Sequence, residues 1–341
     1  MTVIRTPATD LLADGRTIRY YGTPPSTLAS DSRALAPQQI SSSLRYDPLH
    51  DEWVTIASHR QTRTHLPDRR DCPLCPSTPG HPTEIPASEY DVVVFDNRFP
   101  SFGASSGGSC EVVCFTPDHT QRFADLSHDK ARLVIEAWAD RTRQLGGRPD
   151  VAQVFIFENR GEEIGVTLHH PHGQIYALPF VAPRTTRMLE ITDRRPETVT
   201  KMLQHEITGP RVVIGTEHWV AFVPEFARWP VELHLYPRRC VTDLAELSGD
   251  EREDLADVYL ECLRRLDRMY NLPLPYISAW HQAPVRALGR DGGWLRCEMF
   301  SVQRPEGKLK YLAGSESAMG VFVNDAAPEQ VAERLRQVGN A

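Results

Sequence analysis

The sequence predicts an α+β fold made of two similar halves, each with mostly antiparallel strands covered by a helix. Short runs rich in β-branched and aromatic residues recur along the chain and predict strands. Two longer segments carry apolar residues at helical spacing behind N-capping residues. The order strand, strand, capped helix, strand, strand occurs around each helix opening, "DLSHD" at 125–129 and "ELSGD" at 246–250. We therefore expect a divergent tandem duplication, for which 341 residues supply enough chain.

The first half contains one predicted helix, residues 127–145, with Ser127 as its N-cap. Apolar runs on both sides of this helix predict the strands that it covers. These runs lie at residues 53–56, 90–102, 110–119, 151–161 and 172–180.

The second half repeats this pattern around a helix predicted over 246–270, which Ser248 and Glu251 open as a capping box. Its apolar side chains fall at helical spacing and predict one buried face. They are Leu255, Val258, Tyr259, Cys262, Leu266 and Met269. The strand-like runs of this half lie at residues 212–230, 232–239, 274–284 and 294–304.

Three regions follow from this pattern. Residues 1–43 are rich in Ser, Thr, Pro and Ala with weak periodicity, and we interpret them as a tail or arm. The first repeat is expected over 44–185 and the second over 186–341.

Charge and composition exclude several classes of protein. The net charge of −7 argues against a general nucleic-acid binder, which usually carries a basic face. No apolar run approaches the length of a membrane span, and the first residues have no apolar core of a secretory signal. Seven cysteines in a long chain without a signal do not suggest a disulfide framework. We expect a cytoplasmic protein.

The stretch "GVTLHHPHGQIYALP" (165–179) concentrates histidines and is the first candidate site. If it is extended, His170 and His172 face one side and His169 the other. Two surface histidines beside a turn are one interpretation of this pattern. The other is chemistry on phosphate, because a neutral imidazole is available as a nucleophile at pH 7 and a phosphoimidazole discharges readily. Gln174 is then a candidate donor to the phosphoryl oxygens, and Gly173 a place of close ligand approach.

The pair Cys72 and Cys75 in "DCPLC" has C-x-x-C spacing. This spacing supplies half of a zinc site, but it is equally compatible with a redox pair or two loop cysteines. No second C-x-x-C is present, so further ligands must come from distant segments.

Several motifs together resemble one family. "HPHGQ" (170–174) is similar to the active-site motif of galactose-1-phosphate uridylyltransferases, a branch of the histidine triad superfamily. The segments "DCPLC", "FTPDH", "FENRG", "WHQAP" and "KYLAGSE" resemble family segments in the same order, over roughly residues 44–337. The resemblance implies two histidine-triad-like repeats. It also implies that His172 takes UMP from UDP-glucose, and that galactose 1-phosphate then accepts it. Gln174 would contact the transferred phosphoryl group and favour transfer over hydrolysis.

The resemblance also implies one structural Zn²⁺ per chain, held by Cys72, Cys75, His119 and His170. Some relatives bind a second metal, for which Glu232 and His281 are candidates here. The expected His-x-His positions hold Arg296 and Glu298, so we expect this iron-type site to be absent and an ion pair in its place.

Substrate contacts are implied at two places. The first group would hold the nucleotide and phosphates: Arg60, Arg63, Asn97, Asn159 and Thr167. The second group lies in "KYLAGSE", which in the family reaches the hexose in the neighbouring subunit's site: Lys310, Gly314 and Glu316. A homodimer with shared active sites is therefore expected. Ser315 and Phe322 depart from the usual residues at the hexose end.

Two alternatives remain open at this point. A related nucleotide-sugar phosphorylase or nucleotidyltransferase would use a different sugar or base. A zinc-stabilised nucleotide-binding module would explain "DCPLC" but would leave His172 and Gln174 without a role.

Overall fold

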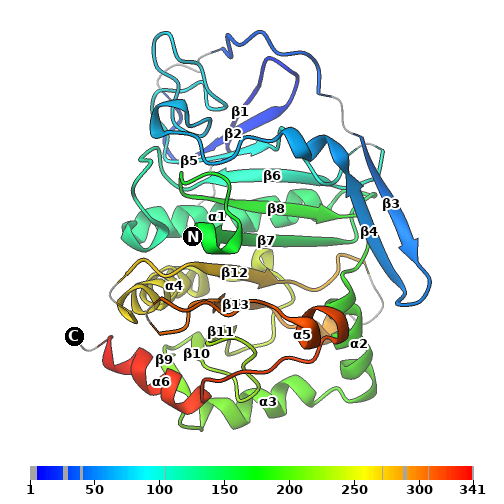
Figure 1. The fold of residues 1–341 in the computed structure, drawn as a ribbon, viewed down its shortest axis with the longest axis vertical. Coiled ribbons are helices and arrows are strands. Elements are labelled where there is room, and N and C mark those ends of the chain that lie inside the picture. The colour runs from blue at the N-terminus through cyan, green and yellow to red at the C-terminus, as the bar shows by residue number, and fades with distance from the viewer. Residues whose placement is uncertain are drawn as a thin grey trace.

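The computed structural model describes residues 6–25, 30–38, 41–103, 105–270, 272–286, 290–305 and 307–339. Within them, eleven strands form one antiparallel sheet that runs through the whole molecule (Figure 1). Its order is β1-β2-β5-β6-β8-β7-β12-β13-β11-β10-β9. The strands are β1 Ala8–Leu11, β2 Thr17–Tyr21, β5 Val92–Asp96, β6 Ser109–Cys114, β7 Gln153–Arg160, β8 His172–Leu178, β9 Val212–Gly215, β10 Trp219–Phe222, β11 Val231–Pro237, β12 Tyr276–His281 and β13 Arg296–Ser301.

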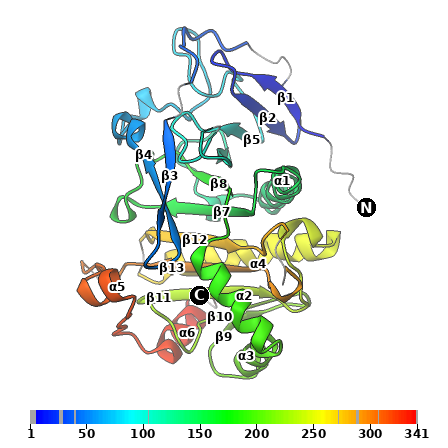
Figure 2. The ribbon, with the colours of Figure 1, turned by 90° about the vertical axis from the view of Figure 1, so that its right-hand side faces the viewer.

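A separate two-stranded hairpin and six helices complete the described fold. The hairpin, β3 Ser42–Asp47 with β4 Glu52–Ala57, forms a sheet of its own, and Leu44 packs against a buried cluster that includes Cys110 of β6 and Leu178 of β8. In Figure 2 the hairpin lies with α5 on the side opposite the two long helices, α1 and α4. The helices are α1 His128–Gly146, α2 Pro183–Arg194, α3 Thr198–Ile207, α4 Gly249–Arg268, α5 Gly314–Met319 and α6 Pro328–Gln337. Among the described residues, no helix combines the length and apolarity that crossing a bilayer requires.

The two halves have the same topology, and the expected fold class is confirmed. In the first half the sheet order is β5-β6-β8-β7 with α1 between β6 and β7 in the chain. In the second half it is β10-β11-β13-β12 with α4 in the equivalent place. The halves meet where β7 pairs with β12, so one sheet spans both. The division at residue 186 remains a prediction, because the sheet continues across it.

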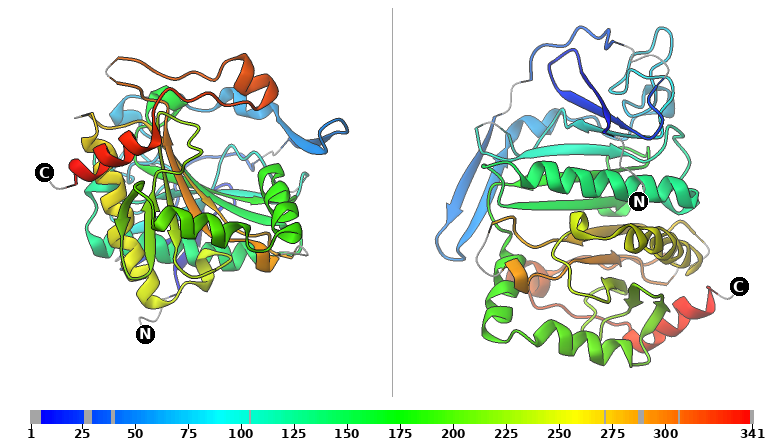
Figure 3. Two further views of the ribbon diagram at one scale, coloured as in Figure 1. Left: turned by 90° about the horizontal axis from the view of Figure 1, so that it is seen from below. Right: turned by 180° about the vertical axis from the view of Figure 1, so that it is seen from behind.

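The helices α1 and α4 lie side by side over one face of the sheet (Figure 3). Their starts are as expected: the Ser127 hydroxyl accepts from Lys130 N, and Ser248 and Glu251 form the capping box. Beneath them, Trp138 from α1 and Tyr259 from α4 pack against Trp280 from β12. This shared aromatic core leaves the opposite face of the sheet for the candidate site.

The N-terminal segment is not a peripheral arm, which corrects our interpretation of residues 1–43. Strand β1 pairs with β2, and β2 continues the sheet by pairing with β5. Ile18, Tyr20 and Tyr21 are buried by this pairing. Part of the segment thus belongs to the first half's core.

Candidate active site

His172 is the first residue of β8, and a hydrogen bond defines the tautomer of its ring. Its Nδ1 lies 2.7 Å from the carbonyl oxygen of His170, which can only accept a hydrogen bond. In the neutral ring the proton is therefore on Nδ1, and Nε2 carries the lone pair. Burial lowers the pKa of His172, which favours this neutral form at pH 7. Nε2 is thus suited to nucleophilic attack.

Gly173 has a packing role rather than the ligand contact that we expected. Side chains alternate along β8, so Gly173 faces the helices while His172 and Gln174 face the other way. A Cβ at Gly173 would lie 2.9 Å from the Phe115 ring and 3.1 Å from the Phe157 carbonyl oxygen. Glycine therefore lets β8 lie close against Phe115.

A cavity of about 300 Å³ opens beside His172 on the Gln174 side, and we call it the Gln174 cavity. It brings together six of the predicted site residues: Arg60, Arg63, Asn97, Thr167, His172 and Gln174. Their segments are far apart in sequence, between η1 (Ser58–Thr62) and β8. Two arginines, two amides and a hydroxyl facing one cavity can bind phosphate oxygens and a sugar.

Arg60 and Asn97 are each held by neighbouring groups. The Arg60 guanidinium donates to Ser101 Oγ and, at 3.3 Å, to Tyr176 OH. The Asn97 side-chain oxygen accepts from Phe99 N at 2.8 Å, so its Nδ2 is the donor that remains for a ligand. The cavity wall is therefore partly preorganised.

A second cavity of about 220 Å³ lies on the other side of His172, and we call it the Asn159 cavity. Asn159 lines it, together with Arg122, Arg160 and residues 273–275 from the second half. His172 lines both cavities. His169, which we expected to be incidental, is exposed but also lines this cavity, and its Nε2 lies 3.3 Å from Glu162 Oε1.

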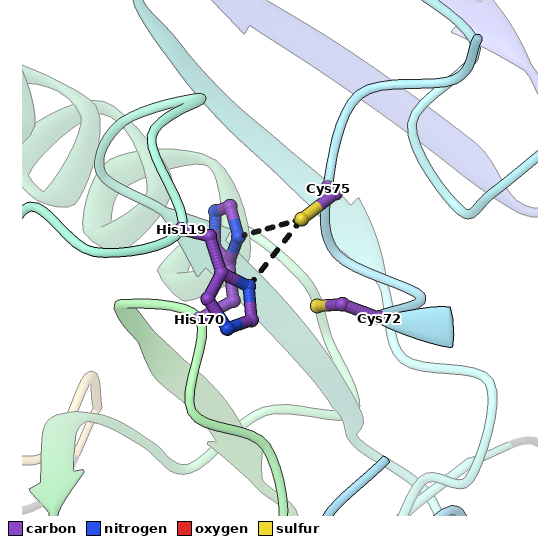
Figure 4. A group of neighbouring side chains, drawn as sticks. All are labelled: Cys72, Cys75, His119 and His170. Carbon is purple, nitrogen blue, oxygen red and sulfur yellow. Dashed lines mark hydrogen bonds between the residues drawn. The ribbon is translucent and has the colours of Figure 1, made fainter. Parts of the chain in front are cut away.

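Cys72, Cys75, His119 and His170 come together from three separate segments (Figure 4). Their ligand atoms all lie within 4.8 Å of one another, and Cys75 Sγ is 3.4 Å from His119 Nδ1 and 3.6 Å from His170 Nδ1. The ligand atoms around a tetrahedral zinc ion lie roughly 3.4–3.8 Å apart. His170 Nε2 lies 2.9 Å from the carbonyl oxygen of Thr116, which leaves Nδ1 free of a proton for a metal. The donor set and its spacing therefore fit zinc.

The electrostatics of this cluster also favour a cation. Burial lowers the pKa of His170 to about 4, so the ring stays neutral. Burial, together with the charge of Cys72, raises the pKa of Cys75 to about 12. A divalent cation would reverse the rise in the pKa of Cys75, because it stabilises the thiolates of Cys72 and Cys75 directly. The backbone carbonyl oxygen of His170 accepts the hydrogen bond from His172 Nδ1. The cluster that holds His170 therefore also fixes the ring of His172.

Comparisons with known proteins identify the family of this chain. The model of the galactose-1-phosphate uridyl transferase N-terminal domain matches residues 103–182, and that of the C-terminal domain matches 199–340. The galactose-1-phosphate uridylyltransferase of Streptomyces lividans is 46% identical over 347 residues, which cover 96% of this chain and 97% of that protein. The chain belongs to the galactose-1-phosphate uridylyltransferase family.

Solved structures extend the comparison. The family fold is seen in a uridylyltransferase structure with a TM-score of 0.77 and 32% identity, covering 87% of this chain and 98% of that one. An ADP-glucose phosphorylase from Arabidopsis thaliana has a TM-score of 0.68 at 22% identity, which shows the fold alone.

The place where some family members bind a second metal holds an ion cluster in this chain. Glu298 is buried, and its Oε1 accepts from Arg296 Nε at 2.9 Å, which confirms the predicted ion pair. Its Oε2 lies 3.2 Å from Arg184 Nη2 and 3.4 Å from His281 Nε2. Burial opposes ionisation, but His281 and Arg296 hold the pKa of Glu298 well below its usual range. Arg184, which α2 carries, is 57% exposed, so the buried part of this cluster is Glu298 with Arg296 and His281 on the sheet.

Glu232 does not join this cluster, contrary to our suggestion that it lies with His281. Its Oε1 is 2.8 Å from His234 Nε2, and its Oε2 accepts from the backbone N–H groups of Arg228 and Trp229. Glu232 therefore organises the loop before β11.

We expect Glu298→Gln to destabilise the fold by about 3 kcal/mol, because it leaves the largely buried guanidinium of Arg296 without its carboxylate. Urea unfolding would measure this loss. The exposed Glu225→Gln is the control, with an expected change below about 0.5 kcal/mol. Equal stability of the two variants would show that the cluster does not stabilise the fold.

Neither cavity is lined by Lys310, Gly314 or Glu316. Lys310 is buried, donates to the carbonyl oxygens of Arg228 and Val323, and lies 3.5 Å from Glu316 Oε1. Gly314 opens α5, and Glu316 accepts from Ser315 Oγ at 2.9 Å. Lys310 and Glu316 thus stabilise this loop internally, and their contact with a hexose remains a prediction.

Sequence reasoning missed several residues that line the Gln174 cavity, among them Glu84, Arg98 and Phe99. Arg98 and Phe99 directly follow Asn97, which was a predicted site residue. Their position next to it could therefore have indicated that they also line the site. Glu84 lies in a loop with no motif, and no sequence pattern indicates it.

Proposed function

We propose that this chain transfers UMP from UDP-glucose to galactose 1-phosphate through a covalent uridylyl-histidine. The observation that carries this proposal is His172, with its tautomer fixed through Nδ1, between two cavities. Family membership supports the same reaction. The protein would act in galactose metabolism, in the cytoplasm, without nucleic-acid or membrane partners.

In the first half-reaction, His172 Nε2 attacks the α-phosphorus of UDP-glucose and forms a P–N bond. The bond from the α-phosphorus to the bridging oxygen breaks, and glucose 1-phosphate leaves with both electrons. In the second, a phosphate oxygen of galactose 1-phosphate attacks the same phosphorus, the P–N bond breaks and UDP-galactose forms. The imidazole regains its lone pair, so no net proton is consumed.

The residues of the Gln174 cavity have distinct roles in this proposal. Arg60 and Arg63 offset the two negative charges of the diphosphate, and Gln174 and Thr167 donate to its oxygens. Asn97 binds the nucleoside, and Asn159 contacts the substrate from the other side of His172. By analogy with the family, glutamine at position 174 favours transfer to a sugar phosphate over hydrolysis.

Product analysis tests this function. Purified protein is incubated with UDP-glucose and each of several acceptors: galactose 1-phosphate, other hexose 1-phosphates and inorganic phosphate. We expect UDP-galactose and glucose 1-phosphate in equal amounts. Turnover that requires inorganic phosphate would instead indicate a phosphorylase. Nucleotide binding without turnover would indicate a binding module.

Zinc at the Cys72, Cys75, His119 and His170 cluster has a positional role in this proposal, since it holds the residue that accepts from His172. We expect one zinc and no tightly bound iron per chain, measured by elemental analysis of protein purified without metal addition. One stoichiometric iron would contradict this assignment.

We also propose a homodimer. The β3–β4 hairpin and the C-terminal loop expose large apolar side chains that water does not favour. Those of the hairpin are Tyr46, Leu49, Trp53, Val54 and Ile56, and those of the loop are Tyr311, Leu312, Met319, Val321 and Val323. Both surfaces lie on the side of the sheet away from α1 and α4 (Figure 2). A second copy that covers them would bring its own Glu316 loop toward the cavities of the first.

The variant Val54→Asp should weaken this dimer, because it places a charge in the apolar surface of the hairpin. Sedimentation at micromolar concentration should show a dimer for the original protein and an increased monomer fraction for the variant. Activity should fall with the dimer fraction. An original protein that is monomeric and fully active would exclude shared active sites.

A further inference from the structure

The N-terminal segment reaches the wall of the Gln174 cavity through three side chains, Arg16, Arg33 and Gln38, which we call the brace residues. They contact the turn after β5, residues 96–99, and Glu84. Asn97, Arg98, Phe99 and Glu84 all line the cavity. A segment that composition describes as a tail thus supports the candidate nucleotide site.

Gln38 fixes the backbone of this turn. Its Nε2 donates to the carbonyl oxygens of both Asn97 and Arg98, each at 2.8 Å. Arg16 Nη1 donates to the carbonyl oxygen of Asp96 at 2.9 Å. Three successive carbonyl groups are therefore held from the N-terminal side. The side chains of Asn97 and Phe99 then face the cavity from a fixed backbone.

The other brace contacts concern charge. Glu84 is buried at the cavity wall, where a lone carboxylate would repel the phosphates of a nucleotide. Its Oε2 lies 2.6 Å from Arg16 Nη2 and its Oε1 lies 2.7 Å from Arg33 Nη1. Arg98 is farther from Glu84, at 3.4 Å, and is about half exposed. Arg16 and Arg33 also pair with Asp14 at 2.8 Å and with Asp31 at 2.7 Å, so they share their charge among three carboxylates. Their contacts with Glu84 are nevertheless shorter than that of Arg98, which leaves the half-exposed Arg98 the cation most available to a ligand.

We propose that Arg16, Arg33 and Gln38 are positioning residues for the nucleotide, and that they set both its affinity and the discrimination between bases. They act through the turn at 96–99 and through Glu84. The inference rests on the proposed function, since it takes the Gln174 cavity as the nucleotide site.

The test uses the full chain with Gln38→Met, which keeps the side-chain length but removes the donor, and Arg33→Gln. The exposed Ser32→Ala is the control on the same segment. Calorimetric titration with UDP should give a Kd about fivefold higher for Gln38→Met, as expected for lost hydrogen bonds. The ratio of kcat/KM for UDP-glucose over ADP-glucose should fall in both variants. The KM for galactose 1-phosphate should stay within about twofold.

A merely structural role would lower the thermal midpoint and reduce binding of all substrates in proportion. That result, or a UDP Kd equal to the original in both variants, would overturn the inference while the proposed function stands. An original protein that does not bind UDP would overturn both, and the two failures are thereby distinguishable. If one variant does not fold, the other decides, since they act through different contacts.

Discussion

His172→Gly should lose on the order of 10,000-fold in kcat, since the account assigns to this ring the formation of the covalent intermediate. Glycine removes the nucleophilic Nε2 and the Nδ1 bond to His170. The two cavities remain, so UDP binding should change by less than about threefold. Steady-state rates and calorimetric titration with UDP measure the two effects separately.

The matched control is His169→Gly, three residues from His172 in sequence. His169 also lines the Asn159 cavity, but its ring is exposed and lies beside the exposed Glu162. Its kcat should stay within about twofold of the original. Comparable losses in both variants would mean that disturbance of the loop, rather than loss of a nucleophile, explains the effect. Retained turnover in His172→Gly would reject the mechanism.

Loss of zinc from the Cys72, Cys75, His119 and His170 cluster should have the second large effect. This effect should be on the stability of the fold first and on kcat second. Structural zinc contributes on the order of 10 kcal/mol to folding in small zinc domains. Because the extensive hydrophobic core of this chain also stabilises the fold, we expect a smaller effect here. Cys75→Ser should lower the free energy of unfolding by about 5 kcal/mol and the thermal midpoint by roughly 10 °C. Elemental analysis should show substoichiometric zinc, and kcat should fall because the carbonyl of His170 no longer holds His172 in place.

The control for this variant is Cys240→Ser, an exposed cysteine outside the cluster. It should keep its zinc and its thermal midpoint within about 2 °C. A Cys75→Ser protein with full zinc and unchanged stability would contradict the assignment of Cys75 as a ligand.

The sequence predicted the elements whose signals are local. Ser127 and Ser248 cap their helices through contacts within one turn, so the starts of α1 and α4 could be read directly. Helix α2 buries few side chains, Thr185 and Thr192 among the described residues, and its pattern was too weak to predict. Strands β1 and β2 were missed because they are short and owe their stability to pairing with β5, far along the chain.

The candidate site divides in the same way. Cys72 and Cys75 are recognisable from spacing, but His119 and His170 are 44 and 95 residues from Cys75, and only the family resemblance assigned them. Glu84 and Gln38 carry no motif at all. Their roles depend on tertiary contacts that no local pattern contains, so the structure was needed to find the brace.

The most direct test of the central claim is isolation of the covalent intermediate. The protein is mixed with UDP-glucose labelled at the α-phosphate, quenched at alkaline pH, digested and sequenced by mass spectrometry. We predict acid-labile label on the peptide that contains "HPHGQ", with UMP attached to His172, and its discharge to UDP-galactose when galactose 1-phosphate is added before the quench. Label on another residue, or turnover without any labelled protein, would contradict the account.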